Sequence, residues 1–249
     1  YTASELAGFA AAARDWLAER SPRTPKLRIV MPDDPAATVS VVEIVNDDMP
    51  FLLDSVLGGL RERGLDPLLV AHPILAVERD EAGRLRSFRP IAQGGAGAAR
   101  ESLIHVHVER VGDAARRDET LAALAATLAD VRLAVEDWGA MRATVDDVIA
   151  TLEREQPPLP AGELAEAIAF LRWLNDDNFT FLGLRAYALD GTETTENGAA
   201  QPLGILRRSD VKVLRRGREL VAVTPELMEF LQEPKALIIT KANARSRVH

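Results

Sequence analysis

The sequence contains no cysteine among its 249 residues, which excludes disulfides, thiolate catalysis and the common zinc sites. No apolar run approaches the roughly 20 residues that span a bilayer, and no basic N-terminal region precedes an apolar stretch. The net charge of −8 disfavours a broad nucleic-acid-binding surface. We therefore expect a cytoplasmic protein that contacts neither membranes nor nucleic acids.

The composition is that of a globular protein. Hydrophobic residues make up 47% of the chain and charged residues 27%, which is enough apolar material to bury a core. The length fits one large domain or two small ones. Because the chain begins at Tyr1 and ends just after a strand-like run, we expect it to be a piece of a longer protein.

The first 36 residues read as a helix followed by a proline-rich linker. Apolar residues recur at helical spacing over 2–19, which predicts an amphipathic helix. Four prolines then fall within 21–35, where a short extended piece is predicted at 27–30. This segment, 1–36, is expected to precede the first domain.

Residues 37–156 carry the pattern of an α+β, ferredoxin-like module with an antiparallel sheet. The predicted order is strand, helix, strand, strand, helix. A further short strand is predicted at 84–91, and the main elements fall at 38–45, 51–63, 66–79, 101–110 and 113–130. The clean alternation over 101–110 predicts one buried face. His105 and His107 are then placed on the opposite, solvated or interface-facing side.

The second predicted helix does not obviously stop. Apolar residues recur on a seven-residue grid from Leu121 to Leu152, which predicts a long helix, or a kinked helix pair with its kink at Gly139. The alternative is a strand over 131–135. Prolines near 157–160 end this region, and a second, smaller α+β module is predicted over 160–249.

The candidate binding site is the turn between the first predicted strand and helix of this module. Unpaired N–H groups and the helix dipole at a helix start favour a ligand carboxylate, and acidic side chains accept hydrogen bonds from an ammonium group. Together these features suit an amino acid as effector. The alternative is that Asp48 merely caps the helix, with Pro50 in its first turn. The residues concerned are Asn46, Asp47, Asp48, Met49, Pro50 and Phe51.

Three other groups of residues have the chemistry of possible sites. His105 and His107 have the strand spacing of a metal-binding pair, but no metal site is predicted because a plain sheet surface explains them. Asp176 and Asp177 are expected to form a turn rather than a catalytic pair. A basic cluster suits either a phosphate-bearing ligand, an acidic neighbouring domain or a solvated face, and comprises Arg207, Arg208, Lys212, Arg215, Arg216 and Arg218.

Two resemblances to known proteins favour one fold and one function among these alternatives. Residues 48–53 (DMPFLL) resemble the D-x-P-G-L-L turn of ACT domains, which sense amino acids; Phe51 stands where that turn has a glycine. A wider set of segments resembles the N-terminal region of the large bacterial NAD-specific glutamate dehydrogenases: VEIVNDDMPFLLDSVLGGL (42–60), HPIL (72–75), ESLIHVHVER (101–110), VEDWGAM (135–141) and FLRWLNDDNFTFLGLRAY (170–187).

The resemblance implies tandem ACT-like modules ahead of a distant catalytic domain, in a homo-oligomer controlled by amino acids or metabolites. The full-length protein would oxidise L-glutamate to 2-oxoglutarate with NAD. This segment is expected to hold no cofactor and no catalytic residues, because its only glycine-rich stretch, 93–100, lacks the spacing and strand of a dinucleotide site. A regulatory and assembly role is thus predicted. The alternative is an oligomerisation scaffold that binds no small molecule.

Overall fold

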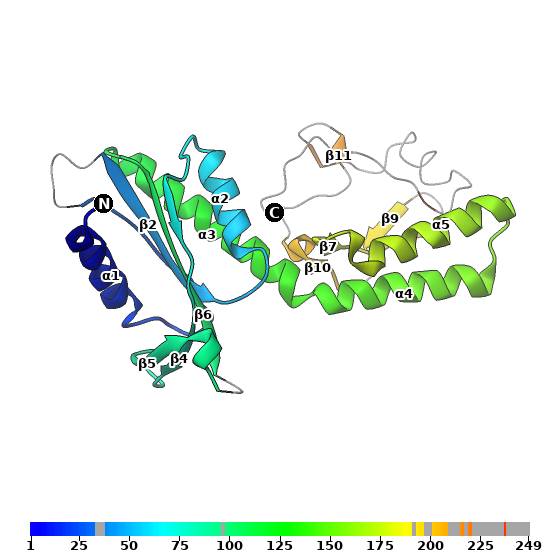
Figure 1. The fold of residues 1–249 in the computed structure, drawn as a ribbon. Coiled ribbons are helices and arrows are strands. Elements are labelled where there is room, and N and C mark those ends of the chain that lie inside the picture. Colours follow the sequence, from blue (N-terminus) through cyan, green and yellow to red (C-terminus); the bar gives the residue numbers. More distant parts are fainter. Residues whose placement is uncertain are drawn as a thin grey trace. The chain divides into compact units, whose positions relative to one another are not determined.

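The computed structural model describes residues 1–32, 38–95, 98–190, 193–196, 201–208, 215–216, 219–220 and 237 (Figure 1). The chain separates into two compact units, one built mainly from Tyr1–Val131 and the other from Arg132–Arg245. The division into segments 1–36, 37–156 and 160–249 stays a prediction. Among the described residues, no helix is both long and apolar enough to cross a membrane.

The first unit is an antiparallel sheet with helices on both faces (Figure 1). Its strands run in the order β1-β2-β6-β4-β5, and β3 also pairs with β6. The α+β, ferredoxin-like class is confirmed. The strands are β1 (Lys26–Val30), β2 (Val39–Asp47), β3 (Leu69–Ala71), β4 (Ile74–Arg79), β5 (Leu85–Pro90) and β6 (Ala99–Glu109). The helices are α1 (Ala3–Leu17), α2 (Leu52–Arg61) and α3 (Ala114–Glu136), with a 3₁₀ turn at Ile91–Gln93.

The sheet is completed by a strand from the N-terminal linker. A βαββαβ unit needs a last strand, which normally follows the second helix. Here α3 continues to Glu136, and the edge beside β2 is taken by β1, paired from Lys26↔Val45 to Val30↔Val41. The short extended piece predicted at 27–30 is therefore an edge strand of the sheet rather than part of a linker.

Helix α1 covers the face of the sheet opposite to α2 and α3 (Figure 1). It begins with a capping box, in which Thr2 and Glu5 bond to each other's backbone N–H groups. Its buried residues join an apolar cluster on the sheet: Ala13, Leu17, Val45, Leu75, Val77 and Leu103. Because α1 supplies this second layer, β6 is buried on both faces and not only on the one that its alternation predicts.

The long helix region is confirmed as helical. Val131 is fully buried within α3, so the alternative strand at 131–135 does not form. The break between α3 and α4 (Trp138–Glu155) falls at Asp137, two residues before the predicted kink at Gly139. One Asp137 oxygen accepts the backbone N–H of Gly204 at 2.7 Å, which fixes the carboxylate at the start of α4.

The second unit is organised around two helices. Helix α4 packs against α5 (Ala161–Trp173) through a small core that includes Val145, Ile149 and Ile168. Short strand pairs follow: β7 (Gly183–Leu184) with β10 (Leu203–Gly204), β8 (Tyr187–Asp190) with β9 (Glu193–Glu196), and β11 (Arg215–Arg216) with β12 (Glu219–Leu220). A 3₁₀ turn spans Ile205–Arg207. The sequence also predicts a strand at 211–214, a helix at 224–231 and a strand at 236–240; of these residues, only 237 is among those that the structure describes.

Candidate functional site

The predicted turn lies where β2 ends and α2 begins, but its residues act differently from the prediction. Asp48 does not cap α2. Phe51 is the N-cap residue, with φ 66° and ψ 0°, and no side chain caps the helix. Asp48 instead ties the turn to β6, because its carboxylate accepts the Ser102 hydroxyl at 2.8 Å and pairs with Arg100 at 3.0 Å. Its backbone N–H also donates to the carbonyl of Arg100.

A cavity of about 500 Å³ opens beside this turn. The N-terminal end of α2 and the half-exposed guanidinium of Arg100 bring positive charge to it, and Asp48 and Asp54 bring carboxylates. His72 also lines the cavity; its Nε2 atom is buried and has no hydrogen-bond partner. Burial lowers the pKa of His72, against the opposing pull of the two carboxylates. The cavity thus offers both signs of charge and one unsatisfied nitrogen.

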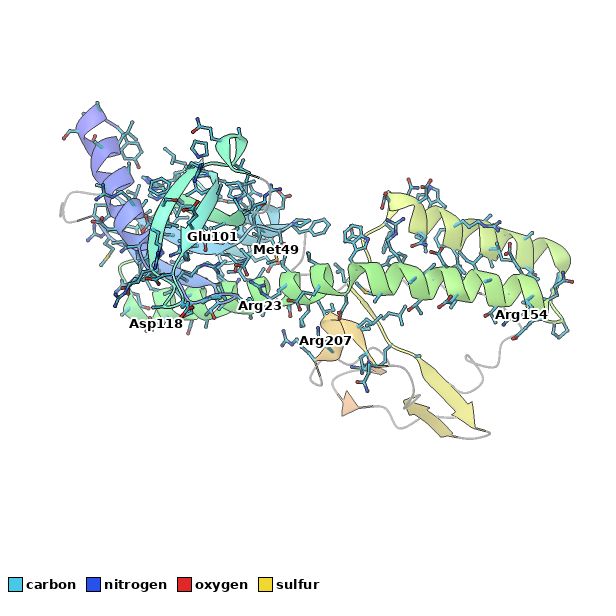
Figure 2. The ribbon with its side chains drawn as sticks, turned by 90° about the horizontal axis from the view of Figure 1, so that it is seen from below. Arg23, Met49, Glu101, Asp118, Arg154 and Arg207 are labelled. Atoms are coloured by element: carbon cyan, nitrogen blue, oxygen red, sulfur yellow. The ribbon has the colours of Figure 1, made fainter. Side chains whose placement is uncertain are left out.

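The six predicted site residues divide into two groups. Met49, Pro50 and Phe51 line the cavity with Asp48, and Figure 2 labels Met49 in this turn. Asn46 and Asp47 do not line it. Asn46 is buried in the sheet, and Asp47 accepts a hydrogen bond from Arg20 on the face that α1 covers. The sequence analysis did not predict Ser102, Arg100 or His72 as site residues, although Ser102 and His72 lie in segments that carry the resemblance and Arg100 directly precedes one of them.

The histidine pair of β6 is buried, so the prediction of a solvated or interface-facing surface is wrong. The two Nε2 atoms lie 2.8 Å apart in a hydrogen bond. His105 Nδ1 bonds Glu43 at 3.1 Å, and His107 Nδ1 bonds the Tyr1 hydroxyl at 2.5 Å. Phe9 of α1 packs edge-on against both rings. All four ring nitrogens are therefore engaged within the first unit, and helix α1 hides the pair.

Electrostatics follow from this burial. Burial, together with the neighbouring His105 charge, lowers the pKa of His107 to about 4. Burial alone would raise the pKa of Glu43, but hydrogen bonds from His105 and Arg28 outweigh it and leave that pKa lowered. Burial and the neighbouring imidazole thus favour the neutral form of His107, against the opposing pull of the Glu43 carboxylate on its pKa.

The remaining candidates have structural roles within the second unit. Asp176 and Asp177 lie in a π-helical turn at Leu174–Asn178, whose Asn178 amide donates to backbone carbonyls; this confirms the predicted turn. Arg207 pairs with Asp137 at 3.5 Å and lies beside the start of α4 (Figure 2). Lys212 and Arg218 of the basic cluster lie outside the described residues.

Comparison with known proteins decides the family. Residues 1–124 match the family model described as the glutamate dehydrogenase ACT1 domain. This chain belongs to that glutamate dehydrogenase family. It is 31% identical to an NAD-specific glutamate dehydrogenase of Halomonas elongata over 98% of the chain and 16% of the relative. A protein of the same description from Pseudomonas aeruginosa is also 31% identical, over 99% of the chain and 15% of the relative.

A third relative, an NAD-specific glutamate dehydrogenase of Mycobacterium tuberculosis, is 29% identical over 70% of the chain and 11% of its own length. The chain thus spans about one sixth or less of the curated relatives it matches. The ACT1 match begins at residue 1 and so includes α1 and β1. This extent agrees with the pairing of β1 with β2 in one sheet.

Phe51 has a backbone conformation that favours glycine, the residue at this place in the D-x-P-G-L-L turn that the sequence resembles. The residue has a positive φ, which costs a non-glycine residue about 1–2 kcal/mol. We expect Phe51→Gly to raise the free energy of unfolding by about 0.5–1 kcal/mol, because glycine's greater freedom in the unfolded chain offsets part of the gain. Urea unfolding of the two proteins measures this. A clear loss of stability would show that contacts of the Phe51 ring outweigh the backbone strain.

The buried histidines of the ACT1 domain predict a pH effect. His107 has an ordinary pKa of 6.5 and a folded pKa of about 4, so between these values the unfolded state binds the extra proton. Stability should therefore fall as pH drops from 6.5 to 4, with a slope contribution approaching about 1.4 kcal/mol per pH unit. His107→Gln removes this titration but keeps a neutral polar group. An unchanged slope in that variant, measured by urea unfolding at several pH values, would contradict the assignment.

Proposed function

We propose that this chain is a regulatory segment of an NAD-dependent glutamate dehydrogenase, and that the cavity at the Asp48 turn senses a small amino acid or a related metabolite. The full-length protein would oxidise L-glutamate to 2-oxoglutarate with NAD in the cytoplasm. Its catalytic domain and the other subunits of a homo-oligomer would be the partners of this segment. The observation that carries the sensing role is the mixed charge of the 500 Å³ cavity beside α2.

The cavity matches the two ends of an amino acid. The first turn of α2 has no side-chain cap, so its N–H groups and the helix dipole favour a carboxylate, and Arg100 is a second partner for the same group. Asp54 and Asp48 line the cavity and would accept hydrogen bonds from an ammonium group. The unsatisfied Nε2 of His72 remains to bond a further polar group of the ligand.

The contacts of Asp48 supply a route from the ligand to the sheet. In the present state Asp48 pairs with Arg100 and accepts the hydroxyl of Ser102, which ties the turn to β6. The carboxylate of a bound amino acid would pair with Arg100, and its ammonium group would pair with Asp48. The ligand would then bridge Asp48 and Arg100, which pair directly in its absence. Such a ligand binds two arrangements of the turn with different affinity, which is the requirement for allosteric control.

Thermal unfolding with ligands tests the sensor. The 249-residue chain is melted with each of the twenty amino acids and with 2-oxoglutarate at millimolar concentration. A ligand present at about a hundred times its Kd stabilises the folded state by about 2.7 kcal/mol, so a clear rise in Tm is expected for an effector. Arg100→Gln should abolish the rise. Arg89→Gln is the matched control, because Arg89 is a half-exposed arginine paired with Glu78 away from the cavity.

Two results would overturn the sensor role of this cavity. One is loss of the Tm rise in both variants, and the other is that none of the compounds raises the Tm of the wild-type chain. The second candidate, an oligomerisation scaffold, would then remain. It is favoured by exposed apolar side chains on the helices of the second unit, namely Val148 of α4 and Trp173 of α5. Sedimentation of the wild-type chain and of a Val148→Asp, Trp173→Asp variant tests it, since a scaffold should dissociate in the variant.

A further inference from the structure

A second cavity, of about 450 Å³, lies on the other side of the sheet from α2, between α1 and the strands. Its walls are almost entirely apolar. Helix α1 contributes one wall, and β3, β4, β5 and β6 contribute the rest, with Leu6, Phe9, Ala10, Leu69, Leu75, Phe88 and Leu103 among the lining residues. The rings of His105 and His107 also line it. The family assignment and the proposed sensor at Asp48 make no use of this cavity.

The histidine rings that line the cavity have no ring nitrogen left to bond a ligand. Every ring nitrogen of His105 and His107 is already bonded to Glu43, to Tyr1 or to the other ring. Water in a cavity needs two to four polar partners, and apolar cavities of this kind take apolar molecules instead. Since an apolar cavity of about 150 Å³ is enough to hold benzene, this larger volume suits an apolar ligand of one or two fused rings.

The lining indicates the shape of the ligand. Phe9 packs against the histidine rings with centroids 4.8 Å from His107 and 6.0 Å from His105. Phe88 lines the same cavity and remains 45% exposed, as Leu6 remains 48% exposed. Two phenyl rings and two imidazoles favour a flat aromatic body, which would cover the apolar surface that these side chains leave in water.

The lining also indicates where a charged group belongs. Among the described residues that line the cavity, Arg14 is the only one with a permanent charge, and its side chain is largely exposed with a 3.7 Å ion pair to Asp15. An acidic group on the ligand would meet this guanidinium at the solvent side while the aromatic body stays inside. We propose that this cavity binds a small aromatic carboxylic acid, at a site separate from the turn at Asp48.

The test uses indole-3-acetate as the probe, with the neutral indole-3-acetamide and plain acetate beside it. Isothermal titration calorimetry of the 249-residue chain should show binding of both indoles and none of acetate. Arg14→Gln should raise the Kd of indole-3-acetate about two- to threefold, as expected for the loss of a single exposed charge. The Kd of indole-3-acetamide should not change. Arg100→Gln should alter neither, which separates this site from the sensor at the Asp48 turn.

A pair of neighbouring substitutions locates the site. Ala10 is exposed and lines the cavity, whereas Ala11 is exposed and does not line it. Ala10→Phe fills part of the space and should weaken the indoles about tenfold, the effect of losing roughly 60 Å² of apolar burial. Ala11→Phe adds the same ring to the same helix and should change binding less than twofold. Ala71→Phe, on the facing strand, repeats the blocking test should Ala10→Phe fail to fold.

Three results would overturn the proposal. The first is the absence of binding by either indole at millimolar concentration. The second is equal affinity in Ala10→Phe and Ala11→Phe, which would place the probe elsewhere. The third is concentration-dependent association of the wild-type chain that Ala10→Phe abolishes, which would make a second copy of the chain the occupant of the cavity.

Discussion

Glu101→Ala is expected to lower the free energy of unfolding by about 3–5 kcal/mol, because it removes the carboxylate that two buried guanidinium groups, those of Arg20 and Arg79, share. One Glu101 oxygen accepts Arg20 Nε at 3.1 Å and Arg79 Nε at 2.8 Å, and the other accepts Arg79 Nη2 at 2.7 Å. The Glu101 side chain is 3% exposed and that of Arg20 is 4% exposed. Figure 2 labels Glu101 within the sheet.

The control for this change is Glu78→Ala. Glu78 also pairs with an arginine, Arg89 at 3.0 Å, but its side chain is 61% exposed and the pair lies on the surface. Removing it should cost about 0–1 kcal/mol. Urea unfolding monitored by circular dichroism gives both values. Equal small losses for the two variants would mean that water reaches Arg20 and Arg79 and that the network contributes little.

Gly83→Ala is expected to cost about 3 kcal/mol or more, because an alanine there meets two penalties at once. Gly83 has φ +80°, and a Cβ at this position would lie 2.3 Å from the backbone oxygen of Arg20. The Gly83 carbonyl also accepts the Arg20 N–H at 3.0 Å and Arg79 Nη1 at 2.9 Å. Relief of the clash by backbone movement would therefore disturb the buried arginine network.

Gly64→Ala separates the two penalties. Gly64 has φ +67°, and a Cβ there would meet nothing within 4 Å, so only the left-handed backbone is penalised. We expect a loss of about 1 kcal/mol for this variant. The difference between the two variants, measured by urea unfolding, gives the cost of the contact with Arg20. No difference would show that the turn at Gly83 relaxes freely and is not held by the network.

Local spacing in the sequence was enough to predict most elements of the first unit. Helix α1 follows from apolar residues at helical spacing, strand β6 from their alternation, and the long helices α3 and α4 from their recurrence on a seven-residue grid. The turn at residues 46–51 was predicted because it separates the strand pattern at 38–45 from the helix pattern at 51–63. Its capping was not. Aspartate is a common N-cap residue, but the carboxylate of Asp48 bonds Ser102 and Arg100 of β6. Phe51 is the N-cap residue of α2 instead.

The sequence by itself determined the order of helices and strands, the family resemblance and the place of the candidate turn, because each depends on residues close together in the chain. Tertiary structure decided the rest. Strand β1 completes the sheet, and α1 buries the His105–His107 pair. Arg20 forms a hydrogen bond with Glu101, which lies 81 positions away in the sequence. Partners this far apart leave no periodic signal. Their burial depends on which face α1 covers, a choice made by packing of the whole domain.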